Sequence, residues 1–312
     1  MSEVAVIHQR VYLLIESIWL WLKYFFFFPI FSFFPPPFPY LFARYLSRLD
    51  YLYNVTKKRS MKKWMVELLG RSHFSRKELD LATRRYFEVI YCDEIDNFIY
   101  LFGFSKSFIR RLKIEGEGNL SEALRSHGGF LLCTHFGGGF WILPFLRDKG
   151  MKVQFYSPDI KKEDYPYKKA FYAYLRFSNW MIQKVFNRRI IYKREGKESI
   201  IKALKEGKWV TTAFDVPPYL VRENMEVQFL GKKTRFPKGL FSIAKEVNAP
   251  ILPFFSYLDK GKGRKICFEK PIDVMDEREC VENCIKMVER KIKEKPDHWH
   301  LWPFADQFFS QP

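Results

Sequence analysis

A histidine followed by glycines is the stretch of this sequence best suited to acid–base chemistry. His135 comes just after the apolar run Phe130–Cys133, and Gly137 and Gly138 follow it closely. A histidine can take a proton from an attacking hydroxyl or amine. Glycines allow a reacting group to approach backbone N–H groups that stabilise a developing negative charge. The stretch therefore predicts His135 as a general base and the amides of Gly137 and Gly138 as oxyanion donors.

Three kinds of chemistry use glycine loops of this type. Esterases and lipases also need a serine in a G-x-S-x-G sequence, which is absent from the chain. Phosphate-binding loops need G-x-x-x-x-G-K-[ST] or G-x-G-x-x-G, and neither occurs. Transfer of an acyl group from a thioester needs only the histidine and the amides. Acyl transfer is therefore the preferred interpretation, and an esterase is a weaker alternative.

The elements that must position His135 are short apolar runs that alternate with helical stretches. Seven runs are typical of strands: 111–116, 129–134, 152–156, 188–192, 209–214, 249–257 and 265–269. The helical stretches are 74–104, 120–126, 140–148, 166–186, 196–206 and 237–247. This alternation predicts an α/β fold with a central, largely parallel sheet and helices on both faces.

Ligands of such sheets bind beyond the carboxyl ends of the strands. His135 directly follows one predicted strand, and Asp159 and Asp215 lie just past two others. We therefore expect the three side chains at one edge of the sheet, where either aspartate could orient the imidazole. Surface or helix-capping roles remain open for both aspartates.

The first forty residues are apolar and rich in aromatic side chains. Val11–Phe27 reads as a helix that ends at Pro29, and the next stretch, PIFSFFPPPFPYLF, contains five prolines. Because prolines remove backbone donors, this region is expected to dip into one leaflet as an anchor instead of spanning the bilayer. The basic stretch Lys57–Lys63 would then face anionic lipid headgroups. Residues 1–40 are thus predicted to be a membrane anchor and residues 41–312 one α/β domain.

Composition narrows the class of partner. The chain has 53 Lys+Arg against 35 Asp+Glu, a formal charge of +18, which predicts an anionic partner. The aromatic content of 19% favours an anionic membrane lipid over nucleic acid. Five cysteines without paired spacing indicate a reducing, cytoplasmic compartment. Cys280 and Cys284, even with His298 and His300 nearby, lack the ligand spacing of a zinc site, so no metal is expected.

The order of several motifs resembles one known family. The stretch IEGEGNLSEALRSHGGFLLCTHFGGGFWIL (Ile114–Leu143) is similar to the bacterial lipid A biosynthesis acyltransferases, the lauroyl and myristoyl transferases. Arg194–Pro218, Val227–Phe255 and Lys295–Phe304 resemble later segments of the family in the same order. The resemblance implies an enzyme on the cytoplasmic face of the bacterial inner membrane. It also implies acyl carrier protein or acyl-CoA as the donor, as a thioester co-substrate and without a further cofactor.

The resemblance and the charge also suggest residues that hold the substrates. Arg176 falls where the family has an arginine, and Arg188 and Arg189 open the following predicted strand. Lys232 belongs to a basic stretch, GKKTRFPKG, that could dock an acidic carrier or be only a solvated loop. Phe140 and Trp141, with other aromatic side chains, could line a slot for a hydrocarbon chain, or be ordinary core residues. The arginines suit phosphate or carboxylate groups.

One departure from the family pattern concerns the catalytic motif itself. The family has an acid at the fifth residue after the histidine, and here that residue is Phe140. An acid at that place would orient the imidazole and stabilise its cationic form. Another carboxylate could take its place, with Asp215 and Asp159 as candidates, or His135 could work without an acid. The remaining alternative is a catalytically impaired lipid-binding pseudoenzyme.

Overall fold

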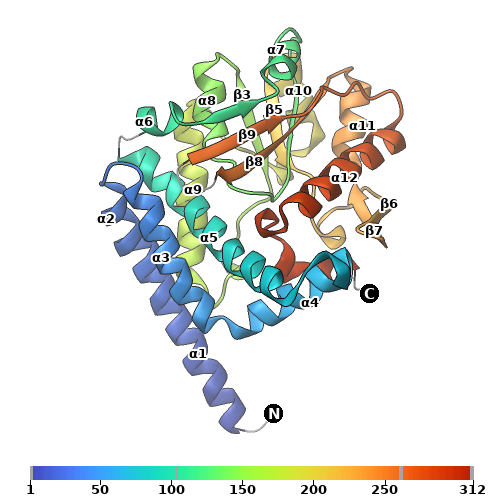
Figure 1. Ribbon diagram of the computed structural model, residues 1–312. Coiled ribbons are helices and arrows are strands. Elements are labelled where there is room, and N and C mark those ends of the chain that lie inside the picture. The colour runs from blue at the N-terminus through green and yellow to red at the C-terminus, as the bar shows by residue number, and fades with distance from the viewer. Residues whose placement is uncertain (1–2, 103–104, 260–262, 310–312) are drawn as a thin grey trace.

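The computed structural model describes residues 3–102, 105–259 and 263–309 (Figure 1). Its centre is a seven-stranded sheet with the order β1-β9-β8-β2-β5-β3-β4. These strands are β1 (Lys113–Glu115), β2 (Gly129–Cys133), β3 (Val153–Ser157), β4 (Ile191–Tyr192), β5 (Trp209–Ala213), β8 (Ile251–Asp259) and β9 (Gly263–Phe268). Within this sheet β8 and β9 pair antiparallel, and the other described pairs are parallel. The predicted α/β class with a largely parallel sheet is confirmed, and each predicted strand overlaps an observed one.

Helices cover both faces of the sheet and give it two separate cores. The helices after β1 are α7 (Glu117–Ala123), α8 (Ile142–Asp148), α9 (Lys169–Phe186), α10 (Gly196–Lys205), α11 (Gly239–Glu246) and α12 (Glu277–Glu294). Phe130 and Leu132 of β2 pack into the core under α10, α11 and α12. Leu131, between them, packs into the core under α8 and α9. Successive strand residues point to opposite faces, so β2 is buried on both sides and reads as a continuous apolar run.

A two-stranded hairpin lies outside the main sheet. It consists of β6 (Asn224–Phe229) and β7 (Lys232–Pro237), which pair antiparallel. The stretch GKKTRFPKG was expected to be a basic loop, and that expectation is wrong for its central residues. Thr234 and Phe236 point inward and are buried, whereas Lys233 and Arg235 point outward. The alternation of apolar and basic residues is the period of a strand with one solvated face.

The N-terminal region is a continuous helix that then turns back on itself. α1 (Glu3–Leu22) runs through a π-helical segment (Lys23–Phe27) into α2 (Phe28–Ser32). The predicted end at Pro29 is therefore wrong, because this proline lies in the first turn of α2, where a helix needs no N–H donor. The proline run at 35–37 instead forms the turn to α3 (Phe38–Tyr53), so the boundary predicted at residue 40 falls inside a helix.

α3 connects this layer to the rest of the protein. It packs along α5 (Arg76–Leu101), and α4 (Val55–Leu69) continues from it beneath the sheet domain (Figure 1). Leu13–Ser32 is helical and, by length and composition, long and apolar enough to cross a membrane. The argument that prolines interrupt the helix thus fails for Pro29 but holds for the proline run at 35–37, where the chain turns between α2 and α3. The exposed large apolar side chains of this layer are Leu14, Ile15, Ile18, Trp21, Leu22, Phe25, Phe26, Ile30, Phe33, Phe34, Phe38 and Leu41.

Candidate active site

The register of two neighbouring strands brings His135 and Asp215 together. β2 and β5 are parallel neighbours in which Cys133 pairs with Ala213. His135 and Asp215 each lie two residues beyond that pair, at the carboxyl edge of the sheet. His135 Nδ1 is 2.9 Å from Asp215 Oδ1. The sheet therefore supplies a carboxylate for the imidazole in spite of Phe140.

Asp215 is held by three donor groups. The His135 backbone N–H donates to Oδ1 and Oδ2, at 2.8 and 3.0 Å. The Trp299 indole N–H donates to Oδ2 at 3.0 Å, and the Asp215 side chain is fully buried. A carboxylate that accepts these bonds can also accept a hydrogen bond from the Nδ1–H of His135, which leaves Nε2 as the proton acceptor. The His135 side chain is 40% exposed, so the imidazole is not sealed inside the protein.

The surroundings of His135 change its basicity. Burial lowers the pKa of the imidazole, but the charge of Asp215 and its hydrogen bonds raise it by more, so the pKa lies above its ordinary value. A raised pKa makes the neutral ring a stronger base, provided that the pH is high enough to keep it unprotonated. The pair thus has the electrostatics of a carboxylate-supported general base.

The glycine loop is fixed by the C-terminal segment. The His300 N–H donates to the His135 carbonyl at 2.7 Å, and the Gly137 N–H donates to the His298 carbonyl at 2.8 Å. Gly137 has φ of +60°, which suits glycine. Because its amide is already bonded, Gly137 is not available as the oxyanion donor that the sequence suggested. Within the described residues the Gly138 N–H has no hydrogen-bond partner, so of the two amides it is the unpaired one, although Gly138 is buried.

Asp159 does not join this site. It follows β3, which is separated from β2 by β5, and it forms an ion pair with Arg194. Of the two carboxylates that the sequence placed near His135, the structure brings only Asp215 into contact with it. The reason is strand order, which the chain order of the strands does not reveal.

The aromatic residues after the glycines belong to the interior. Phe140 and Trp141 are buried in the core under α8 and α9. Phe140 packs against Tyr100, and Trp141 stacks on Phe108 with 5.1 Å between ring centroids. A carboxylate at position 140 would lie in this apolar packing and would have a large desolvation cost. The packing explains the missing motif acid and favours the core interpretation of both residues.

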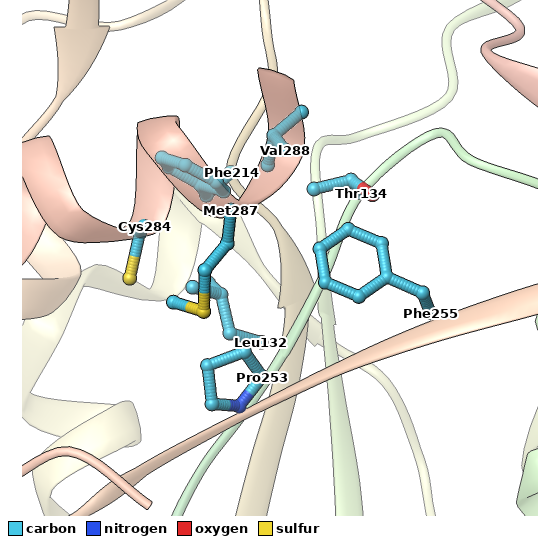
Figure 2. A pocket seen from close by; sticks show the side chains of 8 residues that line it. All are labelled: Leu132, Thr134, Phe214, Pro253, Phe255, Cys284, Met287 and Val288. Carbon is cyan, nitrogen blue, oxygen red and sulfur yellow. The ribbon is translucent and has the colours of Figure 1, made fainter. Parts of the chain in front are cut away.

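Two apolar spaces differ in what they could hold. Figure 2 shows Thr134 among apolar side chains between the sheet and α12, where the free volume is only about 10 Å³. A second cavity, of about 210 Å³, lies between the N-terminal helix, α5 and α9. Its walls are Tyr24, Phe25, Pro29, Phe98, Leu101, Phe102, Tyr174 and Phe177. Only the second is large enough for part of a hydrocarbon chain.

The predicted substrate-binding cations are distributed over the surface. Arg176 is exposed on α9 and donates to the Tyr172 hydroxyl at 3.3 Å. Arg189 pairs with Glu195 at 2.7 Å, and Arg188 beside it is half-buried. Lys232 pairs with Glu67 and lies over the ring of Trp64. In the described part of the chain none of these four contacts His135, Asp215 or the glycine loop.

Sequence reasoning did not identify the residues of the C-terminal segment and α5 that contact Asp215 and the glycine loop. Trp299 and His300 lie in the segment that resembles the end of the family, but no contact was assigned to either. Asp93 on α5 lies against Gly138, and His300 Nε2 is 2.8 Å from Asp93 Oδ2. No sequence signal connects these distant positions. The described residues contain no group of three or more His, Cys, Asp or Glu side chains that could hold a metal ion.

The comparison with protein families agrees with the resemblance of the motifs. Residues 12–303 match the model of the family described as bacterial lipid A biosynthesis acyltransferase. A search of curated protein sequences finds no match. Among solved structures, the chain is similar to the 1-acyl-sn-glycerophosphate acyltransferase PlsC from Thermotoga maritima. That match has 16% identity and a TM-score of 0.35 and covers 78% of this chain and 98% of the other. A TM-score this low supports no conclusion about the present chain.

Proposed function

The chain belongs to the bacterial lipid A biosynthesis acyltransferase family, and from this membership we propose a specific reaction and a catalytic base. The protein moves a fatty acyl group from a thioester, carried by acyl carrier protein or CoA, to a hydroxyl or amine of a lipid or glycolipid. His135 is the general base. The observation that carries the proposal is the 2.9 Å contact between His135 Nδ1 and Asp215 Oδ1. It supplies a carboxylate in place of the motif acid, which this chain lacks because position 140 is Phe.

The reaction would use this geometry in two steps. Nε2 of His135 takes the proton of the acceptor hydroxyl or amine while its oxygen or nitrogen attacks the thioester carbon. Asp215 keeps the Nδ1 proton in place and stabilises the imidazolium that forms. The carbonyl oxygen becomes an oxyanion that the Gly138 N–H stabilises. Collapse of the tetrahedral intermediate breaks the carbon–sulfur bond, and the imidazolium returns its proton to the leaving thiolate.

The N-terminal helices support a location at a membrane. Their large apolar side chains remain exposed in the described structure, although some contact neighbouring rings, and would be covered by lipid. Of the basic residues in 57–63 of α4, Arg59 and Lys63 are exposed, and cations there attract anionic headgroups. We therefore place the protein on the cytoplasmic face of the bacterial inner membrane, where acyl carrier protein and CoA thioesters are available. The donor thioester is a co-substrate, and the reaction needs no further cofactor.

A transfer assay tests the proposal. Purified full-length protein in lipid vesicles is incubated with radiolabelled acyl carrier protein thioester and a lipid acceptor. We expect label in the lipid fraction with the wild-type protein and almost none with His135→Ala. Label released as free fatty acid would favour the esterase, and a folded wild-type protein without turnover would favour the pseudoenzyme. Transfer that survives His135→Ala would remove this histidine from the mechanism.

A further inference from the structure

Gly138 is pressed against a buried carboxylate that the proposed reaction has not used. A Cβ atom built at Gly138 would lie 2.3 Å from Asp93 Oδ1. Such a distance is a clash, so any other residue here would have to displace Asp93. Unlike Gly137, whose φ is +60°, Gly138 has no positive φ to explain the glycine. The close approach of Asp93 is therefore the reason for glycine at position 138.

Asp93 lies in contact with Arg264 and His300, and its carboxylate is kept charged. Arg264 Nη2 lies 2.5 Å from its Oδ1, and the Arg264 side chain is 1% exposed. His300 Nε2 lies 2.8 Å from Oδ2. Burial raises the pKa of Asp93, but Arg264 and His300 lower it by more, so the pKa is below its ordinary value. The carboxylate is ionised at neutral pH, and the guanidinium offsets its charge beside the loop.

The same cluster holds both ends of the glycine loop. His300, which pairs with Asp93 through its ring, also binds the His135 carbonyl through its backbone N–H. The Gly138 carbonyl accepts a hydrogen bond from the Ser256 hydroxyl at 2.6 Å. Gly138 is thus fixed through its Cα atom and its carbonyl, while its N–H has no partner in the described residues.

We infer that Asp93, supported by Arg264 and His300, is a positioning residue that aims the Gly138 N–H at the reacting carbonyl. The inference rests on the proposed acyl transfer. It adds a second carboxylate to the site, with a different task from Asp215. Asp215 orients the base, and Asp93 orients the amide that receives the oxyanion. Neither carboxylate occupies position 140, where the family motif has its acid.

A pair of matched variants tests the inference. Asp93→Asn keeps the shape of the side chain and removes its charge. Asp96→Asn removes a charge from the same cluster, because Asp96 Oδ2 is 2.8 Å from Arg264 Nη2, but its described contacts include none of the loop glycines and reach only Trp141 beyond them. A misaimed donor costs transition-state stabilisation, so Asp93→Asn should lower kcat about tenfold or more with KM within about twofold. Asp96→Asn should leave kcat within about twofold. Equal losses in both variants, or an unchanged kcat in Asp93→Asn, would overturn the inference.

A second variant and a second measurement cover the case in which Asp93→Asn does not fold. Gly138→Ala keeps every charge of the ion cluster but forces the loop and Asp93 apart, so it should lower kcat at least as much. Hydrogen exchange of the peptide that contains residues 134–141 needs no turnover. Exchange there should accelerate in Asp93→Asn and Gly138→Ala but not in Asp96→Asn. If wild-type protein transfers no acyl group, the proposed function fails, and this exchange pattern still decides whether Asp93 positions the loop.

Discussion

The carboxyl edge of the sheet buries polar side chains, whereas the N-terminal helices expose large apolar ones. At the edge, Asp215 is fully buried, and both of its oxygens accept hydrogen bonds. On the helices, large apolar side chains such as Phe25 and Phe26 are about half-exposed, at 47% and 53%. Buried polar groups with partners define a fixed geometry, whereas exposed apolar surface requires another phase or partner to cover it. The edge of the sheet is thus suited to catalysis, and the N-terminal helices are suited to contact with a membrane or a partner.

If the two regions have separate tasks, damage to one should spare the function of the other. The largest effect is expected from Asp215→Asn, which keeps the volume of the side chain but disturbs the tautomer of His135. A comparable change in a histidine–aspartate pair costs about 10⁴-fold in kcat, and we expect a loss of about 100-fold or more here. Binding to anionic vesicles should remain as in the wild-type protein, measured by co-sedimentation.

Asp159→Asn is the control for that variant. Asp159 also follows a strand of the sheet, but it pairs with Arg194 at a distance of two strands from His135. Its removal should change kcat by less than about threefold, as expected for an ion pair near the surface. A large loss of activity in both variants would mean that the edge acts as a whole and that Asp215 has no special role.

Phe25→Asp combined with Phe26→Asp should have the opposite effect, with weaker vesicle binding and little change in turnover. Burial of each phenylalanine in lipid would contribute about 1.5–3 kcal/mol at full burial. Because both are partly covered already, we expect vesicle affinity to fall at least about tenfold, or about 1.4 kcal/mol. Because Phe25 also lines the cavity of about 210 Å³, turnover is measured with a short-chain, water-soluble thioester and acceptor that would not fill this cavity, and it should change little. Co-sedimentation and a soluble-substrate assay measure the two quantities.

Met275→Asp is the matched control, because Met275 is 82% exposed but lies between β9 and α12, away from the N-terminal helices. It should leave vesicle affinity unchanged. If it reduced affinity as much as the double variant, exposed apolar residues in general would mediate membrane binding. The comparison between the two regions would then fail.

The contrast also explains which features could be predicted from sequence. The buried strands could be predicted because apolar runs such as Phe130–Cys133 are a local signal, and His135 could be found because it follows one of them. The choice between Asp215 and Asp159 depends on strand order, which local patterns do not contain. The roles of Trp299 and Asp93 depend on contacts between residues far apart in the chain, so one sequence gives no signal for them.

The N-terminal error has a different physical cause. Pro29 was read as a helix terminator because proline lacks an N–H and clashes inside a helix. In the structure the preceding π-helical segment ends at Phe27, and Pro29 lies in the first turn of α2. The hydrogen-bond pattern changes there, so the missing donor is tolerated. Composition alone could not distinguish this arrangement from a break.

A smaller effect is expected in the pH dependence of activity. The base must be neutral, so kcat/KM falls as the pH drops through the pKa of His135. Because that pKa is raised, the acid limb of the wild-type profile should lie above about pH 6.5, the ordinary value. In Asp215→Asn the charge that raises the pKa is gone and burial remains, so the limb of the residual activity should move to lower pH. An unmoved limb would show that the titrating group is not His135.

The same shift has a consequence for stability. Since the pKa of His135 is higher in the folded protein than in the unfolded chain, pairing with Asp215 contributes stability below the unfolded value. That contribution is lost as the pH rises through the folded value. Asp215→Asn should therefore reduce the pH dependence of the unfolding free energy in this window, and urea titrations at several pH values measure it.

The smallest effect is expected from substitution of Lys232 on the hairpin of β6 and β7. This substitution tests whether the hairpin binds substrate. Its ion pair with Glu67 joins two side chains that are 39% and 35% exposed, and its ammonium lies 5.6 Å from the Trp64 ring centroid. Exposed ion pairs and cation–π contacts contribute about 1 kcal/mol or less. Lys232→Ala should thus lower the unfolding free energy by no more than about 1 kcal/mol in urea titrations, and Lys233→Ala, the control, by less. Because Glu67 already satisfies Lys232, KM for the carrier-protein thioester should rise less than about threefold. A tenfold rise in Lys232→Ala alone would make the hairpin a docking site for the acidic carrier.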